Sequence, residues 1–238
     1  MKNAIILCSG GLDSVTTAYY VKKKLKYNNI VILFFNYKQK SLECERESAI
    51  RAAKKLNASF KEINLEELGK LSTSLINKSG DAKSLSLEEL KDTRKEGRKW
   101  YVPFRNSVFL IYALSLAESL FVKDKIKHDL FVGFKSSVGE GYPDTSSGFL
   151  KVIKKLSKYS MGGEYNIKSP LINKEKEDIV LLGKKLGVDF KDTFSCYVGK
   201  NKHCGVCLSC RLRQESFYWA NLKDPTLYSK KLKDYRGA

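Results

Sequence analysis

A short segment near the start of the chain has the residues of a phosphate-binding loop. Cys8-Ser9-Gly10-Gly11-Leu12-Asp13-Ser14 directly follows the apolar run Ala4–Leu7, which predicts a strand, a tight turn and a helix over 14–24. Two adjacent glycines let the backbone approach a ligand closely, and the free N–H groups at a helix start attract anions. The hydroxyls of Ser9 and Ser14 add donors, and Asp13 can hold Mg²⁺ against phosphates. This glycine loop (residues 8–14) therefore indicates phosphate binding rather than a plain turn in which Asp13 or Ser14 caps the helix.

A second group of reactive residues lies near the carboxyl end. Four of the six cysteines crowd into fifteen residues, as Cys196, Cys204, Cys207 and Cys210. Four thiolates at such spacings can close a tetrahedral zinc site whose role is structural, since no coordination position stays open. An iron–sulfur cluster is the competing interpretation. His203 adjoins Cys204, and because four cysteines already suffice as ligands, we predict a surface histidine there.

Strand-like and helical segments alternate along the chain and predict the scaffold for these residues. Apolar runs typical of buried strands occur at 4–7, 30–35, 60–63 and 130–134. Helical periodicity occurs at 43–56, 106–120, 150–159 and 176–186. This alternation predicts an α/β fold with a parallel sheet covered on both faces. Ligands of such sheets bind beyond the carboxyl ends of the strands, where the glycine loop would lie.

The chain divides by composition into a main domain and a small appendage. We predict an ATP-binding type of domain over 1–190 and a four-cysteine metal-binding subdomain over 191–238. Within the first, residues 69–99 are rich in Ser, Lys, Asp and Gly and carry one short helical patch at 87–93. We interpret this segment as a mobile loop, with a lid and a plain connector both open as its role.

Composition narrows the compartment and the partners. The chain has 238 residues, 42% of them hydrophobic, and its longest apolar stretch, 108–117, is far shorter than the ~20 residues of a membrane span. No charged and apolar leader precedes the glycine loop, so we expect a cytoplasmic protein without a membrane partner. The net charge of +18 suits polyanions such as ATP or RNA, but we favour a generic lysine-rich surface over specific nucleic-acid binding as its explanation.

The glycine loop resembles the SGG-x-DS loop of the ATP pyrophosphatase superfamily, and further motifs narrow the resemblance to one family. The chain resembles the 7-cyano-7-deazaguanine synthases over nearly its whole length, outside the segment 69–99. After SGGLDS come further matching pieces in the family's order: Tyr37 and Gln39, YVPFRN at 101–106, GYPD at 141–144, SPL at 169–171, Lys176, Thr193, Ser195-Cys196-Tyr197, C-x-x-C-x-x-C and Leu212-Arg213.

This resemblance implies an adenine nucleotide α-hydrolase-like fold and an ATP-dependent ligase. A purine-like carboxylic acid would be adenylated, aminated by ammonia, and activated again to leave a nitrile. The glycine loop would hold pyrophosphate and Mg²⁺. Arg105 and Lys176 would stabilise negative charge on the α-phosphate or the carboxylate. Tyr37, Gln39, Tyr142 and Asp144 would face the substrate, with Asp144 accepting hydrogen bonds from a guanine-type edge.

Each of these residues also has a plain structural interpretation, and some family positions differ here. Asn106 suits a helix cap, Lys176 a first-turn surface, and Asp144 a Pro-Asp turn. The family's DYGQRH is replaced by residues 36–41, NYKQKS. A paralogue that joins a deazapurine acid to a protein amine, or a tRNA-modifying adenylating enzyme, therefore stays open beside the synthase. The family resemblance further implies a homodimer.

Overall fold

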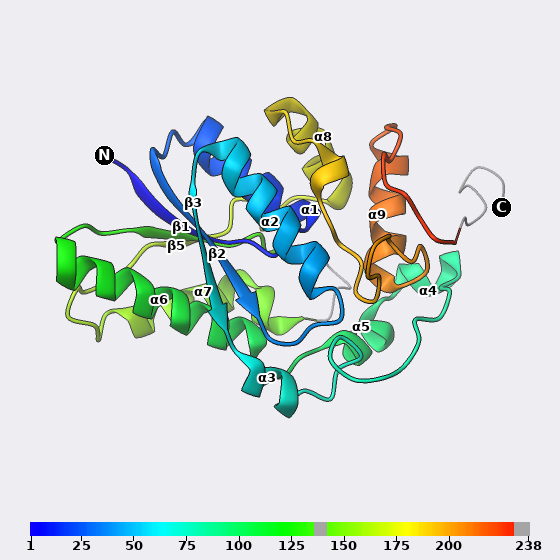
Figure 1. Ribbon diagram of the computed structural model, residues 1–238, viewed down its shortest axis with the longest axis horizontal. Coiled ribbons are helices and arrows are strands. Elements are labelled where there is room, and N and C mark those ends of the chain that lie inside the picture. Colours follow the sequence, from blue (N-terminus) through cyan, green and yellow to red (C-terminus); the bar gives the residue numbers. More distant parts are fainter. Residues whose placement is uncertain (136–141, 231–238) are drawn as a thin grey trace.

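A five-stranded parallel sheet forms the centre of the molecule, in the order β3-β2-β1-β4-β5. The computed structural model describes residues 1–135 and 142–230 (Figure 1). The strands are β1 Asn3–Leu7, β2 Asn29–Asn36, β3 Ser59–Asn64, β4 Asp129–Phe131 and β5 Ile167–Lys168. β1 pairs with β2 on one side and with β4 on the other, so Ala4 faces both Ile30 and Asp129. The predicted α/β class with a parallel sheet is confirmed.

Helices cover both faces of the sheet (Figure 1). They are α1 Leu12–Tyr19, α2 Leu42–Leu56, α3 Glu66–Leu71, α4 Leu87–Lys91, α5 Arg94–Trp100, α6 Arg105–Asp124, α7 Ser147–Ser157, α8 Lys176–Leu186 and α9 Leu208–Trp219. One apolar core joins a sheet face to α1, α2, α8 and α9, with Val15, Ala49 and Ile179 among its members. The other core joins the opposite face to α6 and α7. The central strands β1 and β2 are largely apolar because both of their faces are buried, whereas the edge strand β3 carries polar residues and is partly exposed.

Helix starts and short elements differ from the predictions. α1 begins at Leu12 rather than Ser14, and its helical course continues as a π-helical turn, Tyr20–Lys24. Segment 69–99 contains α4 at the predicted patch and most of α5, and it buries Ile76, Leu85 and Leu90 against the second core. This segment is therefore more ordered than a bare loop, while its movement stays a prediction. β5 has only two residues, too few to give a periodic signal.

Helix α6 is long and apolar enough, by length and composition alone, to cross a membrane. In the structure it is one layer of the fold, because Leu110, Ala113 and Ala117 pack into the second core. Its Glu118 carboxylate accepts hydrogen bonds from the Tyr165 hydroxyl, at 2.5 Å, and from the Gly162 N–H, at 2.9 Å. The helix is thus tied to the segment between α7 and β5 by polar contacts as well as by packing.

Candidate functional site

The glycine loop leaves the end of β1 and runs directly into α1. Gly10 has a φ of 78°, a conformation that favours glycine. The N-cap of α1 is Gly11, which has no side chain with which to cap this helix start. Neither Asp13 nor Ser14 is therefore the cap. The first turn of α1 lies close after the carboxyl end of β1, and its N–H groups can bind an anion there.

Two glycines bring neighbouring elements close to this loop. A Cβ on Gly10 would lie 2.5 Å from the carbonyl oxygen of Glu45, so α2 packs directly against the loop. A Cβ on Gly133, beyond the end of β4, would lie 2.9 Å from the Ser14 nitrogen. The start of α1 is thus wedged between the ends of β1 and β4, where the order of strands reverses direction. Ligands of open α/β sheets bind at this kind of switch point.

Asp13 and Lys176 meet beside the glycine loop although 163 residues separate them. Lys176, the first residue of α8, donates to Oδ2 of Asp13. The other oxygen, Oδ1, is buried and has no hydrogen-bond partner among the residues that the structure describes. A buried carboxylate oxygen without a partner is costly unless a ligand uses it. This arrangement fits a carboxylate that holds a cation next to bound phosphates.

A cavity of about 340 Å³ opens at the carboxyl ends of the strands. It brings together most of the residues singled out from the sequence: Cys8, Ser9, Gly11, Leu12, Asp13, Ser14, Tyr37, Gln39, Arg105, Tyr142 and Lys176. Gly10 faces α2 instead, and Asp144 is not part of the described lining. Residues 136–141, which include Gly141 of GYPD, lie outside the described residues. The volume falls in the range of small-molecule sites.

One wall of the cavity is a cation packed on an aromatic ring. Arg105, the first residue of α6, has its guanidinium carbon 6.0 Å from the centre of the Tyr37 ring. Burial raises the pKa of Tyr37 to about 12, although the Arg105 charge opposes the shift. Tyr37 therefore stays a neutral hydroxyl at physiological pH. Arg105 supplies a positive charge at the cavity wall, which suits an anionic group of a ligand.

Gln39 and Glu45 form a polar group that the sequence did not reveal. The Gln39 amide donates to the Phe35 carbonyl, at 3.1 Å, and to the Glu45 carboxylate, at 3.0 Å, while its oxygen accepts from the Tyr37 N–H. Ser41 donates to the other Glu45 oxygen at 2.7 Å. Burial raises the pKa of Glu45 to about 7, against these hydrogen bonds, which favour the ionised form. Glu45 lines the cavity as a carboxyl group poised to gain or lose a proton.

Tyr142 and Asp144 belong to a turn that contacts the start of α6, because the Asn106 side-chain amide donates to the Asp144 carbonyl at 3.4 Å. The Tyr142 hydroxyl donates to the Gly97 carbonyl at 2.8 Å and so attaches this turn to α5. Oδ1 of Asp144 is buried and finds no hydrogen-bond partner in the described part of the protein. Burial raises the pKa of Asp144, and the Arg105 charge opposes that shift. Asp144 thus has an unused acceptor, as its predicted role requires.

Lys135 is a second cation of the cavity that the sequence did not single out. It follows β4, its side chain is only 5% exposed, and its ammonium group lies 3.4 Å from the Glu175 carboxylate. The chain is rich in lysine, and nothing in the residues around Lys135 distinguishes it from the other lysines. Its place at the end of a central strand, on the same cavity as Lys176, is a tertiary property.

The four cysteines come together as one cluster. Their four Sγ atoms all lie within 4.8 Å of one another, and the pairs Cys196–Cys207 and Cys204–Cys210 are both 3.9 Å apart. Tetrahedral ligands about 2.3 Å from a zinc ion are about 3.8 Å apart. Backbone N–H groups also donate to the sulfurs, as Gly199 does to Cys196 at 3.1 Å. The residues present therefore fit a single tetrahedral ion better than a larger iron–sulfur core.

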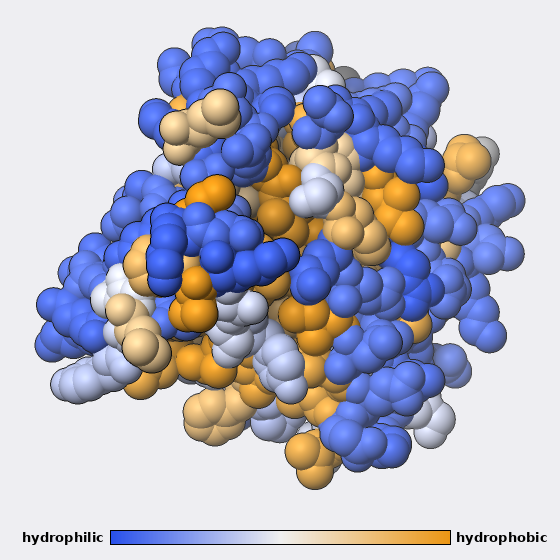
Figure 2. Space-filling model, turned by 60° about the vertical axis from the view of Figure 1, so that its left-hand side comes forward, coloured by the Kyte–Doolittle hydropathy of each residue, from blue (hydrophilic) through white to orange (hydrophobic). Residues whose placement is uncertain are grey.

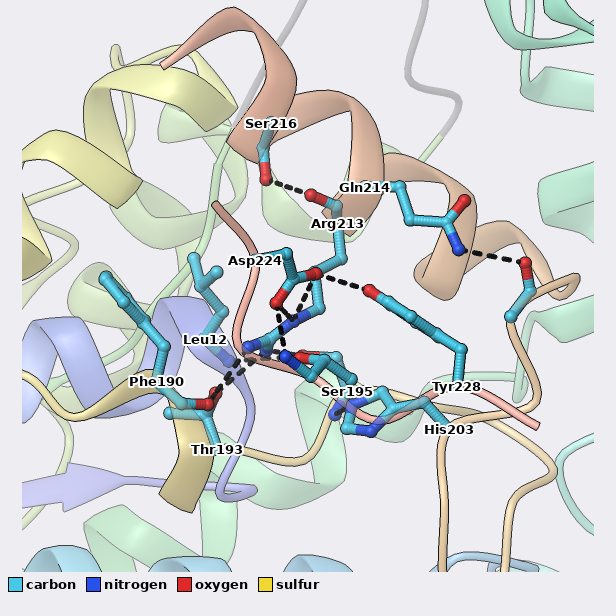
Figure 3. A network of polar contacts seen from close by, with 12 residues as sticks. Leu12, Phe190, Thr193, Ser195, His203, Arg213, Gln214, Ser216, Asp224 and Tyr228 are labelled. Carbon is cyan, nitrogen blue, oxygen red and sulfur yellow. Dashed lines mark hydrogen bonds and ion pairs between the residues drawn. The ribbon is translucent and has the colours of Figure 1, made fainter. Parts of the chain in front are cut away.

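The prediction that His203 lies on the surface is wrong. His203 is buried and packs against the tilted ring of Phe194, with ring centres 4.4 Å apart. It accepts a hydrogen bond from the Ser195 N–H at 3.0 Å (Figure 3). Burial lowers its pKa to about 4, so the ring is neutral and able to accept. A lone histidine beside a cysteine ligand carries no signal of its own burial, since the partners come from distant parts of the fold.

Comparisons with known proteins match nearly the whole chain. The profile of the family "Queuosine biosynthesis protein QueC" matches residues 3–221. A "7-cyano-7-deazaguanine synthase" of Methanoculleus marisnigri is 37% identical over 97% of this chain and 100% of its own length. One of the same name from Sulfurovum sp. is 36% identical over 96% and 99%. The chain belongs to the QueC family.

QueC membership agrees with the resemblance predicted from the motifs. It implies the use of ATP, for which the glycine loop, Asp13 and Lys176 are suitably placed. Among solved structures, a 4-thiouridine synthetase in complex with RNA and bound ATP overlaps at a TM-score of 0.47 and 17% identity, over 92% of this chain and 50% of that one. A similarity this weak does not bear on function.

Proposed function

We propose that this protein is an ATP-dependent 7-cyano-7-deazaguanine synthase. One observation carries the proposal: a single cavity combines a phosphate-type loop, the Asp13–Lys176 pair and the Arg105–Tyr37 wall. The substrate carboxylate of 7-carboxy-7-deazaguanine attacks the α-phosphate of ATP and expels pyrophosphate, and ammonia then displaces AMP to give the amide. The amide oxygen attacks the α-phosphate of a second ATP, again with release of pyrophosphate, and loss of AMP and both amide protons leaves the nitrile.

The chain's own residues contribute position and charge to this sequence. The N–H groups of the glycine loop and of the first turn of α1 bind the pyrophosphate portion of ATP. Lys176 and Arg105 face the cavity and offset the negative charge that develops during each attack on the α-phosphate. Mg²⁺, when bound, neutralises the phosphates, and Oδ1 of Asp13 is the oxygen available to hold it.

The substrate side of the cavity lies along Tyr37, Arg105 and the turn of Tyr142 and Asp144. The flat ring of a deazapurine suits the aromatic surface of Tyr37, whose face already stacks against Arg105. The unused Oδ1 of Asp144 suits the paired N–H donors of a guanine edge. For this contact the Asp144 carboxylate must become accessible from the cavity when substrate binds.

The four-cysteine cluster is proposed to hold structural zinc in a small unit over 191–238, of which 191–230 is described. Helix α9 of this unit packs against α8, and Phe217 enters the first core. The unit is therefore an appendage of the main domain rather than a separate body. Metal analysis should give about one zinc per chain, whereas iron with sulfide would contradict the proposal.

A homodimer through α6 and α7 explains an apolar surface. Only four residues of α6 are buried, and apolar side chains gather on the face seen in Figure 2. The large exposed side chains of these two helices are Ile111, Tyr112, Val122, Val152 and Leu156. Burial between two copies would remove them from water. Light scattering should give about twice the 27.0 kDa of one chain, and a monomer would contradict this part of the proposal.

Incubation with 7-carboxy-7-deazaguanine, ATP, Mg²⁺ and ammonium tests the activity. Mass spectrometry should find the nitrile, with two ATP molecules converted to AMP for each nitrile formed. ATP turnover with a nitrile-free product, or turnover only with a protein or tRNA acceptor, would overturn the synthase proposal in favour of a paralogue.

A further inference from the structure

The glycine loop is held in place by the segment that precedes the first cysteine ligand. The Phe194 N–H donates to the Gly10 carbonyl at 2.9 Å. The Ser195 hydroxyl accepts from the Leu12 N–H at 3.4 Å, so it contacts the first residue of α1 (Figure 3). These contacts fix the positive-φ residue of the loop and the helix start that follows it. They join positions about 183 residues apart in the chain.

Ser195 is held in turn by a buried arginine. Arg213, on α9, donates to the Ser195 hydroxyl at 3.4 Å, to the Thr193 hydroxyl at 2.8 Å and to the Phe190 carbonyl at 3.0 Å. Its side chain is only 2% exposed, and Asp224 balances its charge at 3.4 Å. The planar fork of a guanidinium can make these contacts together, which a lysine ammonium cannot do in the same geometry.

The same segment is anchored to the cysteine cluster from two directions. Ser195 is bonded covalently to Cys196, and its N–H donates to His203, which is bonded covalently to Cys204. Behind His203, the Ser229 N–H donates to the His203 carbonyl at 2.8 Å and the Lys230 N–H to the Cys204 carbonyl at 3.3 Å. The cluster therefore determines where Phe194 and Ser195 meet the glycine loop.

We propose that Ser195 and Arg213 are positioning residues that set the glycine loop for ATP and link its shape to the metal cluster. This inference rests on the proposed use of the loop for ATP, and it goes further by giving the metal unit a role in nucleotide affinity. Neither residue needs to touch the nucleotide. Their hydrogen bonds hold the Gly10 carbonyl and the Leu12 N–H in the geometry that binds phosphate, so that binding does not have to order the loop.

The test measures ATP affinity and loop protection in variants that keep the metal. Ser195→Ala should weaken ATP binding about three- to tenfold, the loss expected for one hydrogen bond. Arg213→Lys should weaken it at least as much. Hydrogen exchange at residues 10–12 should become faster in both variants, while the zinc content and the KM for the carboxylic acid stay unchanged. Tyr165→Phe is the matched control, since it removes a hydroxyl contact with Glu118 just before β5, which is not part of the cavity lining.

The outcomes separate this inference from the proposed function. If both variants bind ATP as the parent does and lose only thermal stability, as Tyr165→Phe is expected to, the positioning role is overturned. Metal removal adds a second arm: chelation should weaken ATP binding less in Ser195→Ala than in the parent, because the side-chain part of the link is already absent from that variant. Equal losses in the two proteins would contradict the link. ATP binding is measured without the acid, so a parent that binds ATP but forms no nitrile refutes only the synthase proposal.

Discussion

The two halves of the cavity differ in how their polar groups are satisfied. On the activation side, the glycine loop is cross-linked by Phe194, Ser195 and Lys176, and Oδ1 of Asp13 is a buried acceptor without a hydrogen-bond partner among the described residues. On the acceptor side, burial raises the pKa of the Glu45 and Asp144 carboxyl groups, and neither forms an ion pair with another described residue. The difference shows that hydrogen bonds already hold the activation side in shape, whereas the acceptor side keeps an acceptor, Oδ1 of Asp144, that a substrate can use.

The largest effect on kcat/KM is expected from Asp13→Ala, which should impair the activation side of the cavity and leave the acceptor side unchanged. Loss of the carboxylate removes the proposed magnesium ligand and the partner of Lys176. We expect kcat/KM to fall about a thousandfold, with the thermal midpoint close to that of the parent. Steady-state kinetics and a thermal melt check both values, and activity near the parent level would contradict the phosphate role.

Arg105→Lys should show whether the Arg105 guanidinium acts on the acid or on ATP. The substitution keeps a positive charge but loses the planar group that stacks on Tyr37. We expect kcat/KM for the acid to fall about a hundredfold, with ATP binding in the absence of acid nearly unchanged. An equal loss of ATP affinity would place Arg105 on the activation side instead.

Asp144→Asn should alter acid recognition only. The amide keeps the size of the side chain but replaces an acceptor with a donor, which opposes the N–H groups of a guanine edge. We expect the KM for the acid to rise about tenfold, with the KM for ATP unaffected. If neither KM changes, Asp144 is a turn residue and the acceptor side must be read by other groups.

Glu45→Gln should have the smallest effect of these substitutions. It tests how burial of the Glu45 carboxyl group changes the free energy of unfolding with pH. The native pKa of about 7 lies above the value near 4.3 of an unfolded chain, so the native state binds more protons between these values. The free energy of unfolding of the parent should therefore fall as the pH rises from about 4.5 to about 7, by roughly 1 to 3 kcal/mol. Urea melts across this range should show a smaller decline in the variant. Parallel pH profiles would contradict the burial of this group.

The glycine loop and the cysteine cluster could be predicted because each is compact in sequence. The strand before Cys8 and the spacing of Cys204, Cys207 and Cys210 carry the signal locally. The place of Lys176 in the same site as Asp13 was expected only from the family resemblance, and their direct contact was not predicted. Glu45, Lys135 and the contact of Ser195 with Leu12 depend on how α2, β4 and α9 pack, which no local pattern encodes. The burial of His203 was missed for the same reason.

The fate of the carboxylate oxygens tests the account most directly. The acid is prepared with both carboxylate oxygens replaced by a heavy isotope and converted in the presence of ATP and ammonium. Adenylation at both stages predicts that the two labelled oxygens leave in two AMP molecules, and that the nitrile carries none. Label found in inorganic phosphate, or retained in the product, would contradict the proposed chemistry of this cavity.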